Sequence, residues 1–128
     1  MTVAEIEQAK KVMPIVSIQN QYNITDRKSE AALNYCEKEK MGFIPWAPIG
    51  GSRNPSLHTT GNALEAEAKR HNVSVVQLAL AWLLQKSPVI LPIPGTSSLA
   101  HLDENIAAEK LLLSPDEWKK IEDLARKS

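Results

Sequence analysis

Three short apolar segments alternate with helical patterns along this chain of 128 residues. The segments are 15–19, 42–47 and 89–93, and helical periodicity fills most of the sequence before, between and after them. Strands that are separated by helices are usually parallel neighbours joined by crossover connections. This alternation predicts an α/β fold with three parallel strands and flanking helices, although Pro45 removes a hydrogen-bond donor from the second strand.

Capping patterns mark where several helices begin. Thr2–Glu5 and Ser74–Gln77 are capping boxes, which predict helices through about Val12 and Lys86. A proline at 115 takes the first position of a terminal helix. Other helical patterns lie around 31–36, over 62–71 and over 99–108, and loops are predicted at 20–27 and 48–60.

Three parallel strands cannot enclose a core by themselves. Parallel sheets need cover on both faces, and their edges must be paired or protected. The chain therefore forms either a small open sandwich or part of a larger structure, and the sequence favours the second. Apolar residues on the strand faces and on the edge of the first strand would then require a partner. The candidates are Val16, Ile18, Ile44, Ile90 and Ile93.

The composition argues against several classes of protein. Fifteen basic and fifteen acidic residues cancel, so the charge indicates neither a nucleic-acid partner nor a membrane surface. No apolar run approaches the ~20 residues that span a bilayer, and the N-terminus lacks a signal-peptide pattern. The lone Cys36 cannot form an internal disulfide, and no Cys/His spacing indicates a metal site. We expect a single cytoplasmic domain over residues 1–128.

The segment 91–105 carries the clearest chemical signal. A short apolar strand ends in a Pro-Gly turn, a hydroxyl cluster follows, and a helical pattern then begins. One of Thr96, Ser97 and Ser98 is expected to cap this helix, whose first N–H groups and dipole attract anions. Gly95 would let a phosphate approach the backbone closely. The segment therefore predicts a phosphorylated ligand at the carboxyl end of a strand.

The segments 15–27, 42–52, 92–97, 104–105 and 113–117 occur here in the order found in aldo/keto reductases. Over essentially all of its length, the chain resembles the C-terminal half of that family. The family folds as a (β/α)₈ TIM barrel, so the resemblance implies a partial barrel that contains the last three β/α units. It also places the catalytic Asp, Tyr, Lys and His on the strands that precede these units, so no residue here is assigned a catalytic role.

The resemblance implies that this half binds a nicotinamide dinucleotide, whose hydride passes to a carbonyl. Gln19 matches a position whose amide holds the nicotinamide carboxamide, and Trp46 matches an aromatic position that stacks on the nicotinamide ring. The competing interpretation gives Gln19 a loop contact and Trp46 a place in the core. The other matched positions line the pyrophosphate (Ala47, Ile49, Gly51 and Ser52), the adenosine phosphate (Gly95, Thr96 and Ser97) and the adenine (Glu104 and Asn105).

Two positions that select between NADP and NAD depart from the family pattern. The family often has a basic residue where this chain has Gly95, and an arginine where it has His101. Arginine forms two hydrogen bonds to a phosphate, whereas neutral histidine offers one donor. The resemblance therefore implies NADP as the cofactor, held in part by His101, and leaves NAD open.

Three functions are open from the sequence. The first is the cofactor-binding half of an oxidoreductase, completed by a complementary N-terminal half-barrel or by self-association. The second is an inactive truncated remnant, and the third is a self-standing α/β module that binds a phosphorylated ligand. Tyr22 and Tyr35 lack the Lys–Asp support that would tune a tyrosine for acid catalysis, so we do not expect activity from this chain alone.

Overall fold

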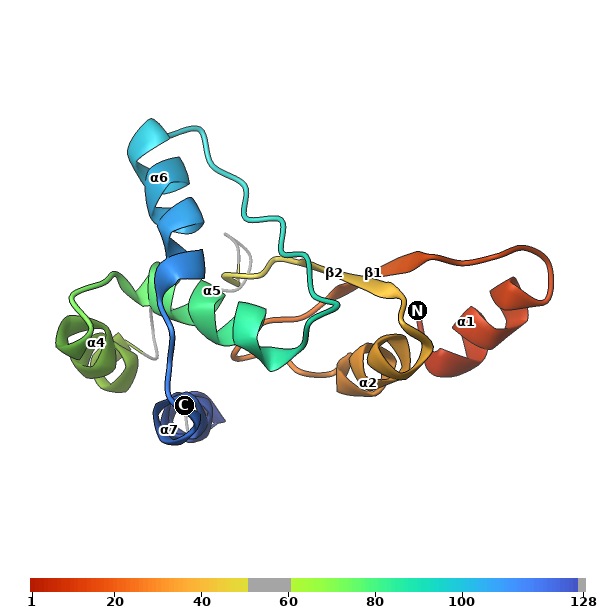
Figure 1. The fold of residues 1–128 in the computed structure, drawn as a ribbon, viewed down its shortest axis with the longest axis horizontal. Helices are drawn as coiled ribbons and strands as arrows, with labels where there is room; N and C mark the ends of the chain where they lie inside the picture. Colours follow the sequence, from red (N-terminus) through yellow and green to blue (C-terminus); the bar gives the residue numbers. More distant parts are fainter. Residues whose placement is uncertain (51–60, 127–128) are drawn as a thin grey trace.

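The computed structural model describes residues 1–50 and 61–126, which form a parallel two-stranded sheet with helices around it (Figure 1). The strands are β1 (Ser17–Gln21) and β2 (Gly42–Trp46), and α2 (Glu30–Glu39) connects them. They pair in register, first residue with first and last with last. The other helices are α1 (Val3–Lys10), α4 (Gly61–Arg70), α5 (Val75–Lys86), α6 (Leu99–Ala107) and α7 (Pro115–Arg126), and a 3-10 turn, η1 (Ala108–Lys110), follows α6.

The capping patterns predicted from the sequence are present. The Thr2 hydroxyl accepts the Glu5 N–H while the Glu5 carboxylate accepts the Thr2 N–H at the start of α1. Ser74 and Gln77 form the same reciprocal pair at the start of α5. Of the three hydroxyl residues considered for α6, Ser98 is the cap. These local hydrogen bonds explain why the helix starts were predictable.

The first strand lies two residues further along the chain than predicted. Asn20 and Gln21, placed in a loop by the prediction, pair with Pro45 and Trp46. Asn20 is buried there because both ends of its amide are satisfied: Oδ1 accepts the Met1 amino group at 2.7 Å, and Nδ2 donates to the Met1 carbonyl at 2.7 Å. A polar residue with such partners can lie inside a covered strand.

The third predicted strand is not confirmed: in the described part of the chain, the segment forms an isolated parallel bridge between Ile90 and Phe43 instead of a strand. The Phe43 N–H donates to the Val89 carbonyl at 2.8 Å, and the Leu91 N–H donates to the Phe43 carbonyl at 2.9 Å. Alternate residues of a strand face alternate edges, so Pro45 is the next residue of β2 to face this segment. Proline has no N–H, and the ladder therefore stops after one pair.

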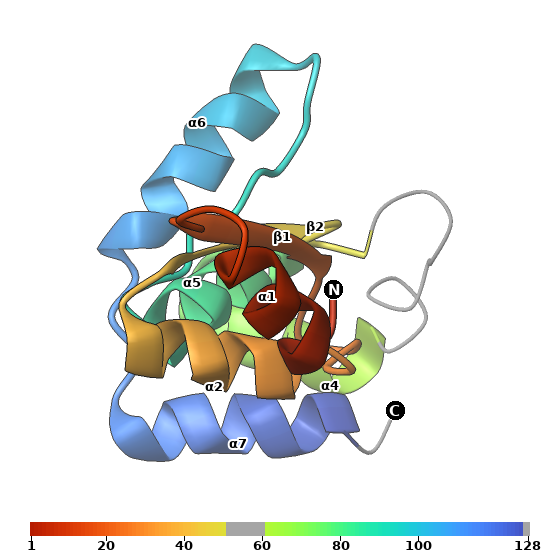
Figure 2. The same ribbon diagram turned by 90° about the vertical axis from the view of Figure 1, so that its right-hand side faces the viewer.

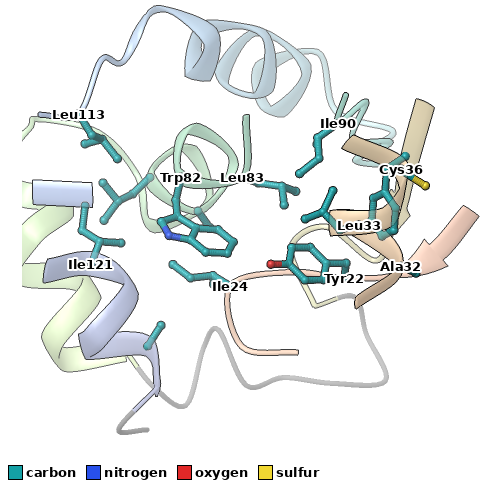
Figure 3. Close-up of a cluster of buried hydrophobic side chains, with 14 of the residues drawn as sticks. Tyr22, Ile24, Ala32, Leu33, Cys36, Trp82, Leu83, Ile90, Leu113 and Ile121 are labelled. Carbon is teal, nitrogen blue, oxygen red and sulfur yellow. The ribbon is translucent and has the colours of Figure 1, made fainter. Parts of the chain in front are cut away.

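The core lies between the sheet and helices α2, α5 and α7 (Figure 3). Tyr22 meets Phe43 edge to face at 5.8 Å between ring centroids and stacks on Trp82 at 6.3 Å. Trp82 in turn stacks on Trp118 at 5.4 Å, and the Trp118 Nε1–H donates to the Trp82 carbonyl. This aromatic row connects the loop after β1 to α5 and α7, and aliphatic side chains such as Leu33 surround it.

The opposite face of the sheet is uncovered among residues 1–50 and 61–126. In Figure 2, α2 and α7 lie on the same side of the strands, while α6 projects away from the body. Of the five residues predicted to require a partner, Ile18 and Ile90 are buried in the core because they face the helices. Val16 and Ile93 are 80% and 46% exposed, and Ile44 is half-buried.

None of the helices in the described ranges is both long enough and apolar enough to cross a membrane. Within the same ranges, no three His, Cys, Asp or Glu side chains come together in a way that could hold a metal ion.

Candidate functional site

One group of the predicted site residues lies on the open face of the sheet. Gln19 is exposed on β1 opposite Ile44, and Trp46 is the last residue of β2. Because side chains two apart on a strand share a face, Gln19 and Trp46 lie on the same side of the sheet. The prediction placed Gln19 at the end of its strand, but β1 continues through Gln21.

The exposure of these two side chains argues against the structural roles considered for them. Trp46 is 43% exposed and is therefore not a core residue. It borders an open cavity of about 420 Å³ whose lining comes mainly from the first residues of the chain and from the start of α2, with Asn20 and Gln21 of β1. The Gln19 side chain has no hydrogen-bond partner among the described residues, so its amide is available to a ligand.

The chain turns sharply after β2. Ala47 has a φ of 50°, which lies in the left-handed region that residues with a Cβ rarely adopt. The Gly50 N–H donates to the Ala47 carbonyl at 3.0 Å, and Pro48 takes the second position of this turn, which suits its fixed φ. Ile49 is half-buried in the turn. The remaining candidates of this loop, Gly51 and Ser52, lie outside the described residues.

A buried asparagine from the loop after β1 holds this turn. Asn23 is completely buried, and its Nδ2 donates to the Ala47 carbonyl at 2.9 Å. Its Oδ1 accepts the Thr25 N–H, the Thr25 hydroxyl and the Asp26 N–H at 2.9, 2.9 and 2.8 Å. No role was predicted for Asn23. The signal that indicates such an Asx turn is an asparagine followed two and three residues later by Thr and Asp.

A second group of predicted residues lies at the start of α6. Thr96 and Ser97 are exposed; the Thr96 hydroxyl accepts the Ser98 N–H at 3.1 Å, and the Ser98 hydroxyl accepts the His101 N–H at 3.4 Å. His101 is exposed as well. A Cβ added at Gly95 would meet nothing within 4 Å, so protein packing does not require glycine there. The first turn of α6 is thus open to solvent.

The two candidates for adenine contact lie further along α6 and are half-buried. The Glu104 carboxylate accepts the Ser74 hydroxyl at 3.5 Å. Asn105 lines an open groove of about 400 Å³, together with apolar residues of α5, α6 and the segment before α6. Since α6 stands apart from the sheet in Figures 1 and 2, the described residues form two separate surfaces, one on the sheet and one on α6.

Both tyrosines considered as acids are engaged elsewhere. The Tyr22 hydroxyl donates to Glu30 at 2.5 Å, and burial, together with that bond, raises the pKa of Tyr22 above its usual value. The Tyr35 hydroxyl donates to Glu7, which raises the pKa of Tyr35, and it accepts the Lys10 ammonium at 2.8 Å. Neither hydroxyl is free to donate a proton to a ligand on the open face.

Comparison with known proteins identifies the family of this chain. The family model described as "Aldo/keto reductase family" matches residues 1–126. The chain belongs to the aldo/keto reductase family. It is 42% identical over 123 residues to an uncharacterized oxidoreductase of Schizosaccharomyces pombe, covering 96% of this chain and 39% of that protein. It is 40% identical over 126 residues to pyridoxine 4-dehydrogenase of Escherichia coli, covering 98% and 43%. The chain thus spans about two fifths of the length of these relatives.

Solved aldo/keto reductases contain the same fold. The thermostable aldo-keto reductase Tm1743, solved with the inhibitor epalrestat, matches 97% of this chain over 46% of its own length, with a TM-score of 0.83 at 30% identity. An aldo-keto reductase from Klebsiella pneumoniae, solved with NADPH, matches 98% of this chain over 45% of its own, with a TM-score of 0.83 at 22% identity. The arrangement of helices and strands is therefore found within larger barrels.

Proposed function

We propose that residues 1–128 are the C-terminal, coenzyme-binding part of a cytoplasmic aldo/keto reductase that reduces carbonyls with NADPH. The chain would supply the last three β/α units of the barrel, even though the third segment forms only one bridge to β2 in the described residues. The observation that carries this proposal is that an exposed Trp46 shares one face of the sheet with Gln19, whose amide has no hydrogen-bond partner among residues 1–50 and 61–126. The relative from Klebsiella pneumoniae, which was solved with NADPH, supports the choice of coenzyme.

The residues present fit a nicotinamide dinucleotide. The Trp46 ring offers a flat apolar surface for the nicotinamide, and the Gln19 amide can donate to and accept from its carboxamide. Thr96, Ser97 and the open first turn of α6 offer hydroxyl and N–H donors to phosphate. His101 is the nearest group in sequence to those donors that can carry a positive charge, and it would contact the 2′-phosphate. The coenzyme would supply the hydride for carbonyl reduction.

We further propose that a complementary half-barrel covers the uncovered surfaces and supplies the proton donor. Leu99, Leu102 and Ile106 repeat at helical spacing on α6 and are all exposed. They continue into the apolar groove beside α5 and the segment before α6. Apolar surface of this kind is costly to leave in water, which favours a protein partner over solvent. A self-standing module is disfavoured because the family match covers residues 1–126.

Titration of the purified chain with NADP⁺ tests the proposal. Quenching of tryptophan emission and isothermal calorimetry should both detect binding, and Trp46→Ala should abolish or strongly weaken the calorimetric signal. Trp118→Phe is the matched control, since Trp118 packs against Trp82 rather than on the open face. Binding that is unchanged in Trp46→Ala would refute the assignment of Trp46. A wild-type chain with no affinity would favour an inactive remnant.

A further inference from the structure

The backbone after β2 adopts a conformation that is unfavourable for the residue present. At Ala47, φ is 50°, and the left-handed region brings Cβ of an L-residue close to neighbouring backbone atoms. Such a conformation persists only where the surroundings hold it. The Ala47 carbonyl accepts two hydrogen bonds, from Asn23 Nδ2 at 2.9 Å and from the Gly50 N–H at 3.0 Å.

The left-handed residue changes the direction of one carbonyl. In an extended strand, successive carbonyls point in opposite directions. Here the Trp46 carbonyl accepts the Tyr22 N–H at 3.4 Å and the next carbonyl, of Ala47, accepts Asn23 Nδ2, so both point toward the loop after β1. The positive φ at Ala47 makes this possible, and it fixes the peptide planes on both sides of the Ala47 Cα. The exposed ring of Trp46 lies directly before this fixed unit.

Asn23 itself is held rigidly. Its side chain is completely buried, and its Oδ1 accepts three hydrogen bonds from Thr25 and Asp26. Four residues further on, Arg27 anchors the same loop to α7 through Glu122 at 2.7 Å. The amide that contacts Ala47 is therefore presented by a loop that is fixed at both ends.

We propose that Asn23 is a positioning residue for the nicotinamide end of the coenzyme site. It holds Ala47 in the left-handed turn and thereby fixes the chain on which Trp46 and the following loop are carried. This inference rests on the proposed function, because it takes Trp46 and Ala47 as coenzyme contacts. Asn23 touches no coenzyme itself; it acts through the Ala47 carbonyl.

The substitution Asn23→Asp tests the donor group of the side-chain amide while it keeps the acceptor oxygen. A carboxylate keeps the oxygen that accepts from Thr25 and Asp26, but it replaces the donor to Ala47 with an oxygen that repels the carbonyl. At about pH 8 the variant should bind NADP⁺ about 10-fold more weakly than the wild type.

Asn34→Asp is the matched control for the added charge. Asn34 is an exposed asparagine of α2 and lies outside the loop after β1. We expect that variant to change NADP⁺ affinity by less than about 3-fold. An NADP⁺ affinity in Asn23→Asp that equals that of the wild type would overturn the positioning role.

A readout that is independent of the coenzyme separates this inference from the proposed function. Hydrogen exchange at the Gly50 N–H, which shares the Ala47 carbonyl, should become about 10-fold faster in Asn23→Asp than in the wild type at about pH 8. If the wild type binds no NADP⁺, the proposed function fails while this result still decides whether Asn23 holds the turn. Unchanged exchange at Gly50 would overturn the inference.

A second pair of variants covers the case in which Asn23→Asp does not fold. Glycine adopts positive φ readily, so Ala47→Gly should make the turn less dependent on Asn23. Asn23→Ser should accelerate exchange at Gly50 about 10-fold in the wild-type background but less than about 3-fold in the Ala47→Gly background. Equal effects in both backgrounds would show that Asn23 does not act through the backbone of residue 47.

Discussion

Replacing Glu122 with glutamine should destabilise the fold far more than removing Arg126, although both residues share one ion-pair cluster. The Glu122 carboxylate lies 2.7 Å from the Arg27 guanidinium, and both of these side chains are only 13% exposed. Arg27 also covers the ring of Trp82 at 4.7 Å and donates to the Ile24 carbonyl. Burial lowers the pKa of Arg27, and Glu122 opposes that effect by stabilising the charged form.

The size of the loss follows from this geometry. At an effective dielectric constant of about 20, opposite charges 2.7 Å apart attract by roughly 6 kcal/mol, and desolvation of the two groups offsets several kcal/mol of that. Glutamine keeps the shape but leaves the buried Arg27 without its counter-ion, so we expect a loss of about 2–3 kcal/mol. Arg126 is 60% exposed and 3.5 Å from the same carboxylate, and its removal should cost about 0–0.5 kcal/mol.

Urea unfolding at neutral pH, followed by circular dichroism and tryptophan fluorescence, measures both losses. A total stability of about 5–15 kcal/mol is usual for a domain, so the difference between Glu122→Gln and Arg126→Ala is well within reach of the assay. High salt should leave the loss in Glu122→Gln nearly unchanged, because the pair is shielded from solvent. If the two variants lose equal stability, or if salt removes the difference, the cluster does not stabilise the fold as argued.

Three further predictions concern the core and its charges. The hydrogen bond from Lys120 lowers the pKa of the buried Glu67 below 4.5. The stability that ionised Glu67 contributes is therefore complete above that value and is lost as the pH falls through the lowered pKa. Glu67→Gln should flatten the acid side of a stability–pH curve measured by urea unfolding. Burial raises the pKa of the Cys36 thiol, so a disulfide reagent should modify the native protein at least about 100-fold more slowly than the urea-unfolded chain. Leu33→Ala should cost about 3 kcal/mol in urea unfolding, whereas the same change at the exposed Leu112 should cost less than about 0.5 kcal/mol.

The helices were predictable because the interactions that start them are local. The Thr2–Glu5 and Ser74–Gln77 pairs lie three residues apart, and each forms the reciprocal bonds that its sequence indicates. The proline at 115 begins α7 for the same kind of reason, since its fixed φ suits the first helical position. The end of α1 differs from the prediction, at Lys10 instead of about Val12.

The ends of the strands depend on distant partners that no local pattern reveals. Asn20 belongs to β1 because Met1, nineteen residues earlier, satisfies its amide. Asn23 and Ala47 lie twenty-four residues apart, and a left-handed alanine has no signature in the sequence of the kind that glycine provides. The sequence therefore indicated Trp46 as a site residue, through the family resemblance, but not the side chain that supports the turn after it.

Two features near the end of β2 were not predicted: the single bridge on one edge and the hydrogen bonds from the loop after β1 on the other. Pro45 cannot donate to the segment that follows α5, so that segment leaves the sheet after Ile90 and carries the start of α6 away from β2 (Figure 1). On the other edge of β2, the carbonyls of Trp46 and Ala47 are held by the loop after β1. The end of β2 is thus released on one edge and fixed on the other. This asymmetry leaves the Trp46 ring exposed while hydrogen bonds hold the backbone beside it, which is the combination that the proposed stacking on a planar ligand requires.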